Sequence, residues 1–223
     1  MPPRKRRYSL RWTFERTLRP EGLAIIAGVD EVGRGCWAGP VYAAAAILPD
    51  GFKHRHLNDS KMLIAEARAE LSQFLCEHPE VHWAIGVATT EEIESHNILG
   101  ASLLAMRRAV EGLKMQPHLC LIDGNQKART ACREITVIDG DARCPSIAAA
   151  SVIAKVARDR AMAELAALYP AFGFENHKGY GTPEHQRALT LHGPCPIHRR
   201  GFKPIRDRTY AGGNDDGGDR ELW

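Results

Sequence analysis

A pair of adjacent carboxylates and a glycine-flanked arginine follow an apolar run near the start of the chain. Asp30 and Glu31 end that run, and Arg34 stands between Gly33 and Gly35. Two carboxylates at the end of a buried strand are costly unless a cation neutralises them. The glycines let the backbone come close to a bound group that the guanidinium can hold. This pattern predicts metal-dependent chemistry on nucleic acid.

The geometry of a strand limits how the first two acids can act together. Asp30 and Glu31 are neighbours on an extended chain, so their side chains should point to opposite faces of a sheet. Both can serve one metal site if the strand ends there, or if Glu31 also contributes its backbone carbonyl. The alternative is a turn-capping aspartate beside a surface glutamate.

Two further acids are candidates for the same site. Asp123 ends the apolar segment 119–122, and Asp141 directly precedes a segment with helical character. Asp-Gly alone is ordinary turn chemistry, so Asp123 is informative only as a third carboxylate beside the first pair. We prefer Asp141 as the fourth acid over Asp139, which resembles a turn residue. We also prefer it over Asp159, because an ion pair with Lys155 four residues earlier on a helix explains that residue.

Three segments could contact the phosphates or rings of a nucleic acid. Lys61 begins a predicted helix, where the cation and the helix dipole could hold a phosphate, although an ordinary solvated lysine fits equally. The loop 177–182 combines Lys178, Tyr180 and glycines, and could stack on a nucleotide ring or serve as a packing lid. The basic stretch 198–200 is expected to be a solvated face.

The apolar patterning predicts an α/β fold. Strands are expected over 23–30, 41–48, 81–88, 119–122 and 134–138, and helices over 62–75, 91–113, 145–168 and 183–191. Residues 58–60 and Thr89 or Thr90 should cap the first two helices, and Pro145 should open the third. Strands interleaved with helices form a mixed sheet flanked by helices. The acids at the strand ends would then lie along one edge, where open α/β sheets bind ligands.

Composition and charge divide the chain into three parts. Its 223 residues, 44% of them hydrophobic, suffice for one domain with a sizeable core, and no apolar stretch approaches the roughly 18 residues that span a bilayer. Residues 1–20 form a basic leader, which we expect to be flexible. Residues 207–223 form an acidic, glycine-rich tail, which we expect to be disordered. The catalytic domain is expected over 21–206.

The cysteines predict a reducing environment. The six of them show no Cys-x-x-Cys pair and no zinc spacing, and most lie among apolar residues (36, 76, 120, 132, 144 and 195). We therefore expect small core residues in a reduced, cytoplasmic protein. The net charge of +3 is too modest to prove a polyanionic partner, although the basic leader would attract phosphates.

Five motifs, in order along the chain, resemble bacterial ribonuclease HII. They are residues 27–41, 58–61, 121–124, 140–159 and 177–182, and the resemblance covers about residues 22 to 205. It implies a ribonuclease H-like mixed five-stranded sheet flanked by helices, with a helical C-terminal portion. Val32 stands where the family commonly has alanine, a small apolar change. The leader and the tail lie outside the resemblance.

The resemblance also implies an activity and the residues that perform it. Asp30, Glu31, Asp123 and Asp141 would bind two Mn²⁺ or Mg²⁺ ions. Gly33, Arg34 and Gly35 would read the ribose 2′-hydroxyl, Tyr180 would pack on the adjoining deoxyribose, and Lys61 would lie near substrate phosphate. The partner would be an RNA–DNA hybrid or duplex DNA that contains ribonucleotides. The protein would act as a monomer, without a membrane, and cut on the 5′ side of a ribonucleotide to leave a 3′-hydroxyl and a 5′-phosphate.

Other functions remain open on the residues alone. A junction resolvase on the same kind of sheet would use similar acids but would not need to sense ribose. A non-catalytic nucleic-acid-binding module would use the acids only structurally. An ATP-binding protein is disfavoured, because the chain has no Gly-x-x-x-x-Gly-Lys-Ser/Thr motif.

Overall fold

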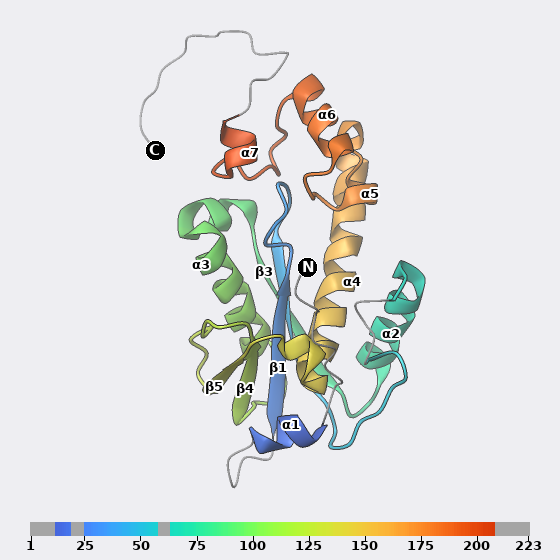
Figure 1. Ribbon diagram of the computed structural model, residues 1–223, viewed down its shortest axis with the longest axis vertical. Helices are drawn as coiled ribbons and strands as arrows, with labels where there is room; N and C mark the ends of the chain where they lie inside the picture. Colours follow the sequence, from blue (N-terminus) through green and yellow to red (C-terminus); the bar gives the residue numbers. More distant parts are fainter. Residues whose placement is uncertain (1–11, 19–24, 58–62, 208–223) are drawn as a thin grey trace, which may run out of the picture. The chain divides into compact units, whose positions relative to one another are not determined.

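The computed structural model describes residues 12–18, 25–57 and 63–207 (Figure 1). These residues form two compact units. The sheet unit contains the described residues up to Arg34 and the described residues of Pro40–Ala161. The C-terminal unit contains Gly35–Gly39 and the described residues from Met162 onward. We describe each unit by itself.

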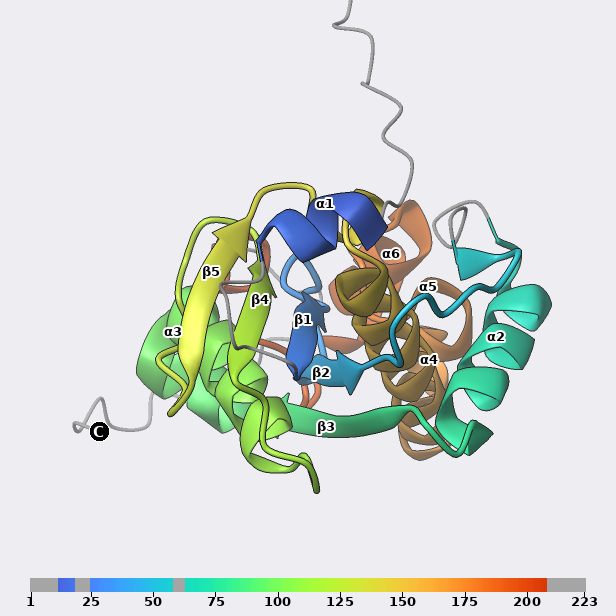
Figure 2. The same ribbon diagram turned by 90° about the horizontal axis from the view of Figure 1, so that it is seen from below.

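The sheet unit is built on five strands in the order β3-β2-β1-β4-β5 (Figure 2). Strand β1 pairs antiparallel with β2 and parallel with β4, β2 pairs antiparallel with β3, and β4 pairs parallel with β5. The sheet is therefore mixed, and the predicted fold class is confirmed. The strands are β1 Ile26–Val32, β2 Val41–Ile47, β3 His82–Ala88, β4 Leu119–Asp123 and β5 Arg133–Val137.

The predicted long helices are present, and the structure adds several short ones. The helical elements are α1 Trp12–Thr17, α2 Ala65–Glu77, α3 Thr90–Glu111, η2 Gly140–Ala142, α4 Pro145–Leu168, η3 Pro170–Phe172, α5 Phe174–His177, α6 Pro183–His192 and α7 Lys203–Arg206. Helix α2 begins after Ile64 without a side-chain cap, and the predicted cap at 58–60 lies outside the described residues. Among the described helices, none combines the length and the hydropathy that crossing a bilayer requires.

Helix α3 covers one face of the sheet because a glycine leaves room for it. A Cβ on Gly86 of β3 would collide with the backbone of Ala105 and Ala109 on α3. The start of α3 is fixed by a capping box, in which Thr89 and Glu92 exchange hydrogen bonds. The predicted cap is thus confirmed at Thr89.

Helix α4 lies against the opposite face. A Cβ on Gly28 of β1 would collide with the backbone of Ser146 and Ile147 in the first turn of α4. The register places Gly28 beside Ala46, two residues along from Ala44, and both alanines are buried. Small residues on both elements therefore let the helix backbone approach the strand closely.

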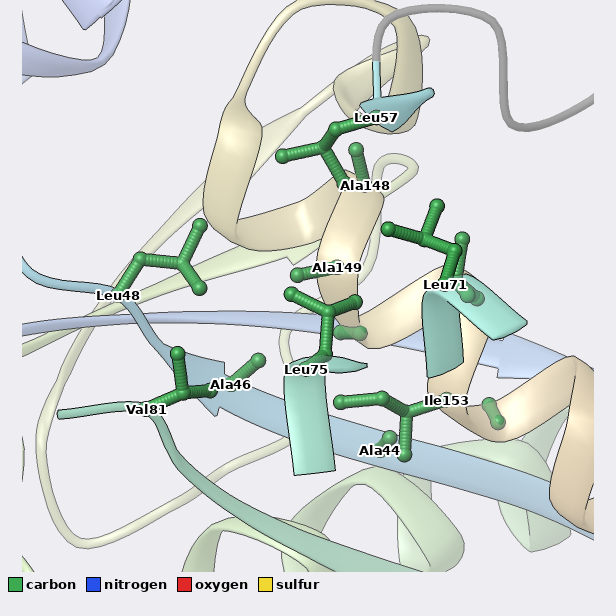
Figure 3. Close-up of a cluster of buried hydrophobic side chains, with 13 residues drawn as sticks. Ala44, Ala46, Leu48, Leu57, Leu71, Leu75, Val81, Ala148, Ala149 and Ile153 are labelled. Carbon is green, nitrogen blue, oxygen red and sulfur yellow. The ribbon is translucent and has the colours of Figure 1, made fainter. Parts of the chain in front are cut away.

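The core on this face joins β2, α2 and α4. Figure 3 shows Leu71 and Leu75 of α2 directed toward Ala149 and Ile153 of α4, above Ala44 of β2. All five side chains are almost completely buried. Burying a leucine stabilises a fold by roughly 1.5–3 kcal/mol, so this cluster fixes the position of α4 relative to the sheet.

Part of the predicted leader is a helix. Residues 12–17 form α1, and its Glu15 is 2% exposed and accepts a hydrogen bond from the backbone N–H of Ser146 at 3.1 Å. The Arg143 guanidinium also lies 4.0 Å from the centre of the Phe14 ring. The carboxylate satisfies an N–H in the first turn of α4 and complements the helix dipole. Residues 1–11 lie outside the described residues, and the domain boundaries stay a prediction.

The expectation of six reduced cysteines is wrong for one pair. Cys120 of β4 and Cys132, just before β5, form a disulfide. The other four cysteines are free, and Cys36 and Cys144 are buried as expected for small core residues. The spacing of 12 residues gave no sign of this pairing, because the parallel pairing of β4 with β5 brings the two sulfurs together.

We predict that Glu15→Ala lowers the free energy of unfolding by about 1–3 kcal/mol, because it leaves a buried N–H of α4 without its acceptor. Urea denaturation measures this. The control is Arg16→Ala, which removes an exposed ion pair with Asp50 and should cost less than about 1 kcal/mol. Equal small losses in both variants would contradict the assigned role of Glu15.

Candidate metal centre

Asp30 lies on the face of β1 that α4 covers. It pairs with Ala44, shares its face with Gly28, and is 6% exposed. Its side chain is hydrogen-bonded to Ser151, one turn into α4, and its Oδ1 also accepts the backbone N–H of Glu31 at 2.8 Å. The close approach of α4 at Gly28 therefore encloses this carboxylate.

Glu31 lies on the other face of the same strand, as its spacing predicts. It pairs with Ala43, which pairs with Gly86 on the face that α3 covers. Strand β1 continues to Val32, so the expectation that it ends at Asp30 is wrong by two residues. The side chain of Glu31 is 12% exposed, and its Oε1 lies 3.3 Å from the Arg34 guanidinium, which forms an ion pair with it.

Asp123 links the end of β4 to the turn that carries Asp141. The register pairs Val29 with Ile122, so Asp30 and Asp123 are the next residues on neighbouring parallel strands. Asp123 Oδ1 accepts the backbone N–H of Gly140 at 2.7 Å. This bond holds η2, in which Asp141 is 8% exposed. Asp123 therefore positions the fourth acid as well as contributing a carboxylate itself.

The electrostatics show that Asp30 is surrounded by negative charge. Its pKa is raised well above the ordinary value, first by burial and then by the charges of Asp123, Glu31 and Asp141, while the hydrogen bond from Ser151 acts in the opposite direction. The other three predicted acids therefore all influence Asp30. The ionised carboxylates of this cluster repel one another, and a bound cation would stabilise them.

The pKa of Glu31 is also raised, chiefly by burial. The Arg34 guanidinium opposes the shift, and the charge of Asp123 adds to it. Since Asp123 affects both Asp30 and Glu31, it lies within electrostatic reach of acids on both faces of β1. Asp123, at the end of β4, therefore links the carboxylates on the two faces of β1 electrostatically.

In the described part of the chain, no three His, Cys, Asp or Glu side chains are arranged to hold a metal ion as they stand. Two of the candidate oxygens, Asp30 Oδ1 and Asp123 Oδ1, accept the backbone N–H groups of Glu31 and Gly140. The donor set nevertheless fits a hard divalent cation, because all four groups are carboxylates and Mg²⁺ and Mn²⁺ prefer oxygen ligands. Asp30, Glu31, Asp123 and Asp141 are the residues that would hold it.

The glycine-flanked arginine has a defined backbone. Gly33 has φ +97°, and a Cβ there would collide with the side chain of Arg158, which is buried and donates to the carbonyl of Pro40 at 3.2 Å. Gly33 is therefore required by the fold. A Cβ on Gly35 would meet no heavy atom of the described residues within 4 Å. The Arg34 side chain is 50% exposed.

The remaining candidate residues, Lys61 and Tyr180, are not among the described residues of the sheet unit. Lys61 falls outside the described residues. Tyr180 belongs to the C-terminal unit and is 41% exposed. Asp159, which we set aside from the acid set, forms the predicted ion pair with Lys155 at 2.6 Å.

Sequence reasoning missed several buried polar residues. The stretch 198–200 is not simply a solvated face, since His198 and Arg199 are 1% and 0% exposed and Arg199 donates to the carbonyl of Gly39. Ser151 and Arg158, two turns apart on α4, were also missed. Their only sequence signal is that they are polar residues in an alanine-rich helix.

The fold and the acid cluster together define a nuclease with a ribonuclease H-like sheet. The profile of the ribonuclease HII family matches residues 27–205, and the chain belongs to this family. It is an endoribonuclease that acts on RNA–DNA hybrids, and its family is metal-dependent. Neither a junction resolvase nor a non-catalytic binding module is favoured.

Named relatives and solved structures agree with this assignment. Ribonuclease HII of Bordetella pertussis is 53% identical over 183 residues, which cover 82% of this chain and 90% of the relative. Ribonuclease HII of Caulobacter vibrioides is 51% identical over 190 residues, covering 85% and 90%. The crystal structure of ribonuclease H2 from Pyrococcus horikoshii matches with a TM-score of 0.70 and 25% identity, covering 82% of this chain and 96% of that one. A Bst-RNase HIII structure in complex with Mn²⁺ shares the fold, with a TM-score of 0.62 and 20% identity over 83% and 69% of the two chains.

We predict that the metal-free protein loses stability as pH rises above the ordinary aspartate pKa of 3.8 toward the raised pKa of Asp30. In that range the folded protein retains a proton that the unfolded chain has released, so rising pH favours unfolding. Asp30→Asn should remove this loss and be more stable than the wild type at pH 7.5. Urea denaturation in EDTA across pH 4–8 measures both effects.

The control for this experiment is Asp139→Asn, at an exposed neighbouring carboxylate with φ 54°, a conformation that asparagine tolerates. It should follow the wild-type pH dependence. If Asp30→Asn follows it too, the carboxylate cluster is not the source of the unfavourable charge.

Proposed function

We propose that this chain hydrolyses the phosphodiester bond on the 5′ side of a ribonucleotide, both in hybrids and at ribonucleotides embedded in duplex DNA. The products carry a 3′-hydroxyl and a 5′-phosphate. The observation that supports this most directly is the cluster of four acids, in which burial and the charges of the other three raise the pKa of Asp30. The cleavage polarity and the embedded substrate go beyond what family membership establishes.

We propose that Asp30, Glu31, Asp123 and Asp141 bind two divalent ions, Mn²⁺ or Mg²⁺. When bound, the ions would activate the attacking water and stabilise the charge that develops on the leaving oxygen. The hydrogen bond from Gly140 fixes one oxygen of Asp123, so this carboxylate offers its other oxygen in a defined direction. The solved Bst-RNase HIII complex with Mn²⁺ supports the choice of metal by analogy of fold.

Substrate selection is assigned to the turn after β1 and to Tyr180. Gly33 and Arg158 fix the turn, Arg34 presents a half-exposed guanidinium, and Gly35 lacks a side chain that would keep a sugar away. The 2′-hydroxyl is what distinguishes RNA from DNA at a given position, so backbone groups of this turn are suited to read it. Tyr180 would pack on the neighbouring deoxyribose, and Lys61 would bind a phosphate. We also propose a monomeric enzyme of the cytoplasm.

The direct test uses a labelled duplex with one embedded ribonucleotide, with and without Mg²⁺ or Mn²⁺. We expect one cut on its 5′ side that needs the metal, and no cut in the all-DNA duplex. Equal incision of both duplexes would contradict ribose sensing, and a cut that survives EDTA would contradict metal dependence.

We predict that Asp30→Asn lowers the cleavage rate by more than about a hundredfold, because even residues that only orient metal ligands cost that much. Substrate affinity in EDTA should stay within a few-fold of the wild type, since Asp30 is 6% exposed and its carboxylate does not bind a substrate phosphate directly. Fluorescence anisotropy measures the affinity. Near-wild-type turnover in this variant would make the site assignment wrong.

We predict that Gly35→Ala lowers cleavage at an embedded ribonucleotide by about tenfold or more, with unfolding free energy changed by less than about 0.5 kcal/mol. The fold itself has room for the added methyl group, so the loss would come from the substrate. The contrasting variant is Gly33→Ala, which should destabilise the protein by more than about 1 kcal/mol because of its positive φ and the contact with Arg158. Unchanged activity of Gly35→Ala would remove this turn from substrate reading.

A further inference from the structure

Three histidines of the C-terminal unit are buried next to one another. His177, His185 and His198 are 7%, 0% and 1% exposed. The rings of His177 and His185 are stacked with centroids 4.6 Å apart, and the Nε2 atoms of His185 and His198 lie 2.9 Å apart. The rings of Phe172 and Phe174 pack around them. A charged imidazole would be costly in such surroundings.

The hydrogen bonds fix the proton positions on His185 and His198. His185 Nδ1 lies 2.9 Å from the carbonyl oxygen of Tyr180, and a carbonyl only accepts, so Nδ1 carries the proton. In neutral His185 the Nε2 atom then carries no proton, so it must accept a hydrogen bond from the Nε2–H of His198. His198 Nδ1 is left unprotonated and accepts the backbone N–H of Cys195 at 2.9 Å, the shorter of its two backbone contacts with Cys195, whose carbonyl oxygen lies 3.2 Å away.

The neighbouring groups fit this single arrangement. His177 Nδ1 accepts the N–H of Gly179 at 3.2 Å, so its Nε2–H donates to the carbonyl of Phe172 at 2.8 Å. Burial lowers the pKa of His198 to about 4, the charges of His185 and His177 add to the effect, and a backbone hydrogen bond with Cys195 opposes it. Burial also raises the pKa of the Cys195 thiol to about 11, so the group 3.1 Å from His198 Nδ1 is neutral.

The chain of bonds ends on the loop that carries Tyr180. The Tyr180 carbonyl accepts from both His185 and the N–H of Thr182, and the Tyr180 N–H donates to the carbonyl of His177. Gly179 holds φ +83°, and its carbonyl accepts the N–H of Trp37. The backbone of Tyr180 is thus fixed on both sides, while its side chain remains 41% exposed.

We propose that His185 and His198 are positioning residues, which hold the Tyr180 backbone through one chain of neutral tautomers that runs from Cys195 to the Tyr180 carbonyl. The inference rests on the proposed role of Tyr180 in contacting the substrate sugar. A proton added to either ring would place two N–H groups against each other, or an N–H against the N–H of Cys195. The network therefore works only while both rings are neutral. Among the described residues, the titratable groups that contact or act on this pair of rings are His177 and Cys195.

The first test uses the wild-type protein and requires no variant. Long-range ¹H–¹⁵N NMR spectra of the histidine rings should show His185 as the Nδ1–H tautomer and His198 as the Nε2–H tautomer. His198 should stay neutral from pH 8 down to about pH 5. The opposite tautomer on either ring, or titration of His198 near the ordinary value of 6.5, would overturn the proposal.

The second test compares two substitutions at one position. In His185→Asn the amide nitrogen can take the place of Nδ1 and keep the bond to Tyr180, whereas in His185→Gln it takes the place of Nε2 and loses that bond. We expect the Gln variant to raise the KM for an embedded-ribonucleotide duplex about tenfold with kcat within about twofold of the wild type, and the Asn variant to change KM less than threefold. Equal KM values in the two variants, both folded by circular dichroism, would overturn the proposal.

A double-mutant cycle separates this inference from the proposed function. If His185 acts through Tyr180, His185→Gln should no longer change KM in a Tyr180→Ala background. A full additional increase in that background would overturn the positioning role. If Tyr180→Ala alone leaves KM unchanged, the role of Tyr180 in the proposed function fails, and with it the functional part of this inference. The NMR result still decides whether the tautomer chain exists.

Discussion

The enclosure of several carboxylates around the end of β1 is the constraint on which the rest of the structure depends. Burial and the charges of three other acids raise the pKa of Asp30, so the metal-free protein carries an unfavourable concentration of negative charge. A fold keeps such a cluster only if a ligand compensates it. In a family of metal-dependent nucleases, divalent cations would provide that compensation, so the stability of the site and its chemistry would have the same electrostatic origin.

The backbone brings these acids together through a few close contacts. Gly28 lets the first turn of α4 approach β1, and the next turn brings Ser151 to Asp30. The bond from Gly140 to Asp123 then fixes the turn that carries Asp141. Glu15 of α1 accepts an N–H at the start of α4, so a residue far from the acids in sequence supports the element that encloses them. The site is therefore sensitive to packing on both sides of α4.

Much of the fold and the acid set could be predicted from the sequence, because apolar runs that end in acids are local signals. All five strands and the four long helices were predicted near their observed bounds, and Asp30, Glu31, Asp123 and Asp141 were selected as one set. The family resemblance implied the mixed five-stranded sheet, whereas the order of its strands was not predicted. The bonding of each acid depends on long-range packing, which no local pattern encodes.

The features that the sequence did not predict also depend on long-range packing. Glu15 lies in a basic segment, and its burial depends on α4, which begins 130 residues later. Cys120 and Cys132 come together only because two parallel strands pair. His198 and Arg199 stand in a stretch whose composition is typical of a surface, yet Arg199 is held by a carbonyl of Gly39, far away in the sequence. Composition predicts average exposure, whereas burial of a polar residue requires a specific distant partner.

A crystal structure of the protein soaked in Mn²⁺, with anomalous data collected at the manganese edge, tests the central claim most directly. The account predicts anomalous peaks bound by oxygens of Asp30, Glu31, Asp123 and Asp141, with at least one carboxylate turned from its present hydrogen bond toward the ion. Manganese bound elsewhere, or these four carboxylates without an ion at saturating Mn²⁺, would contradict it.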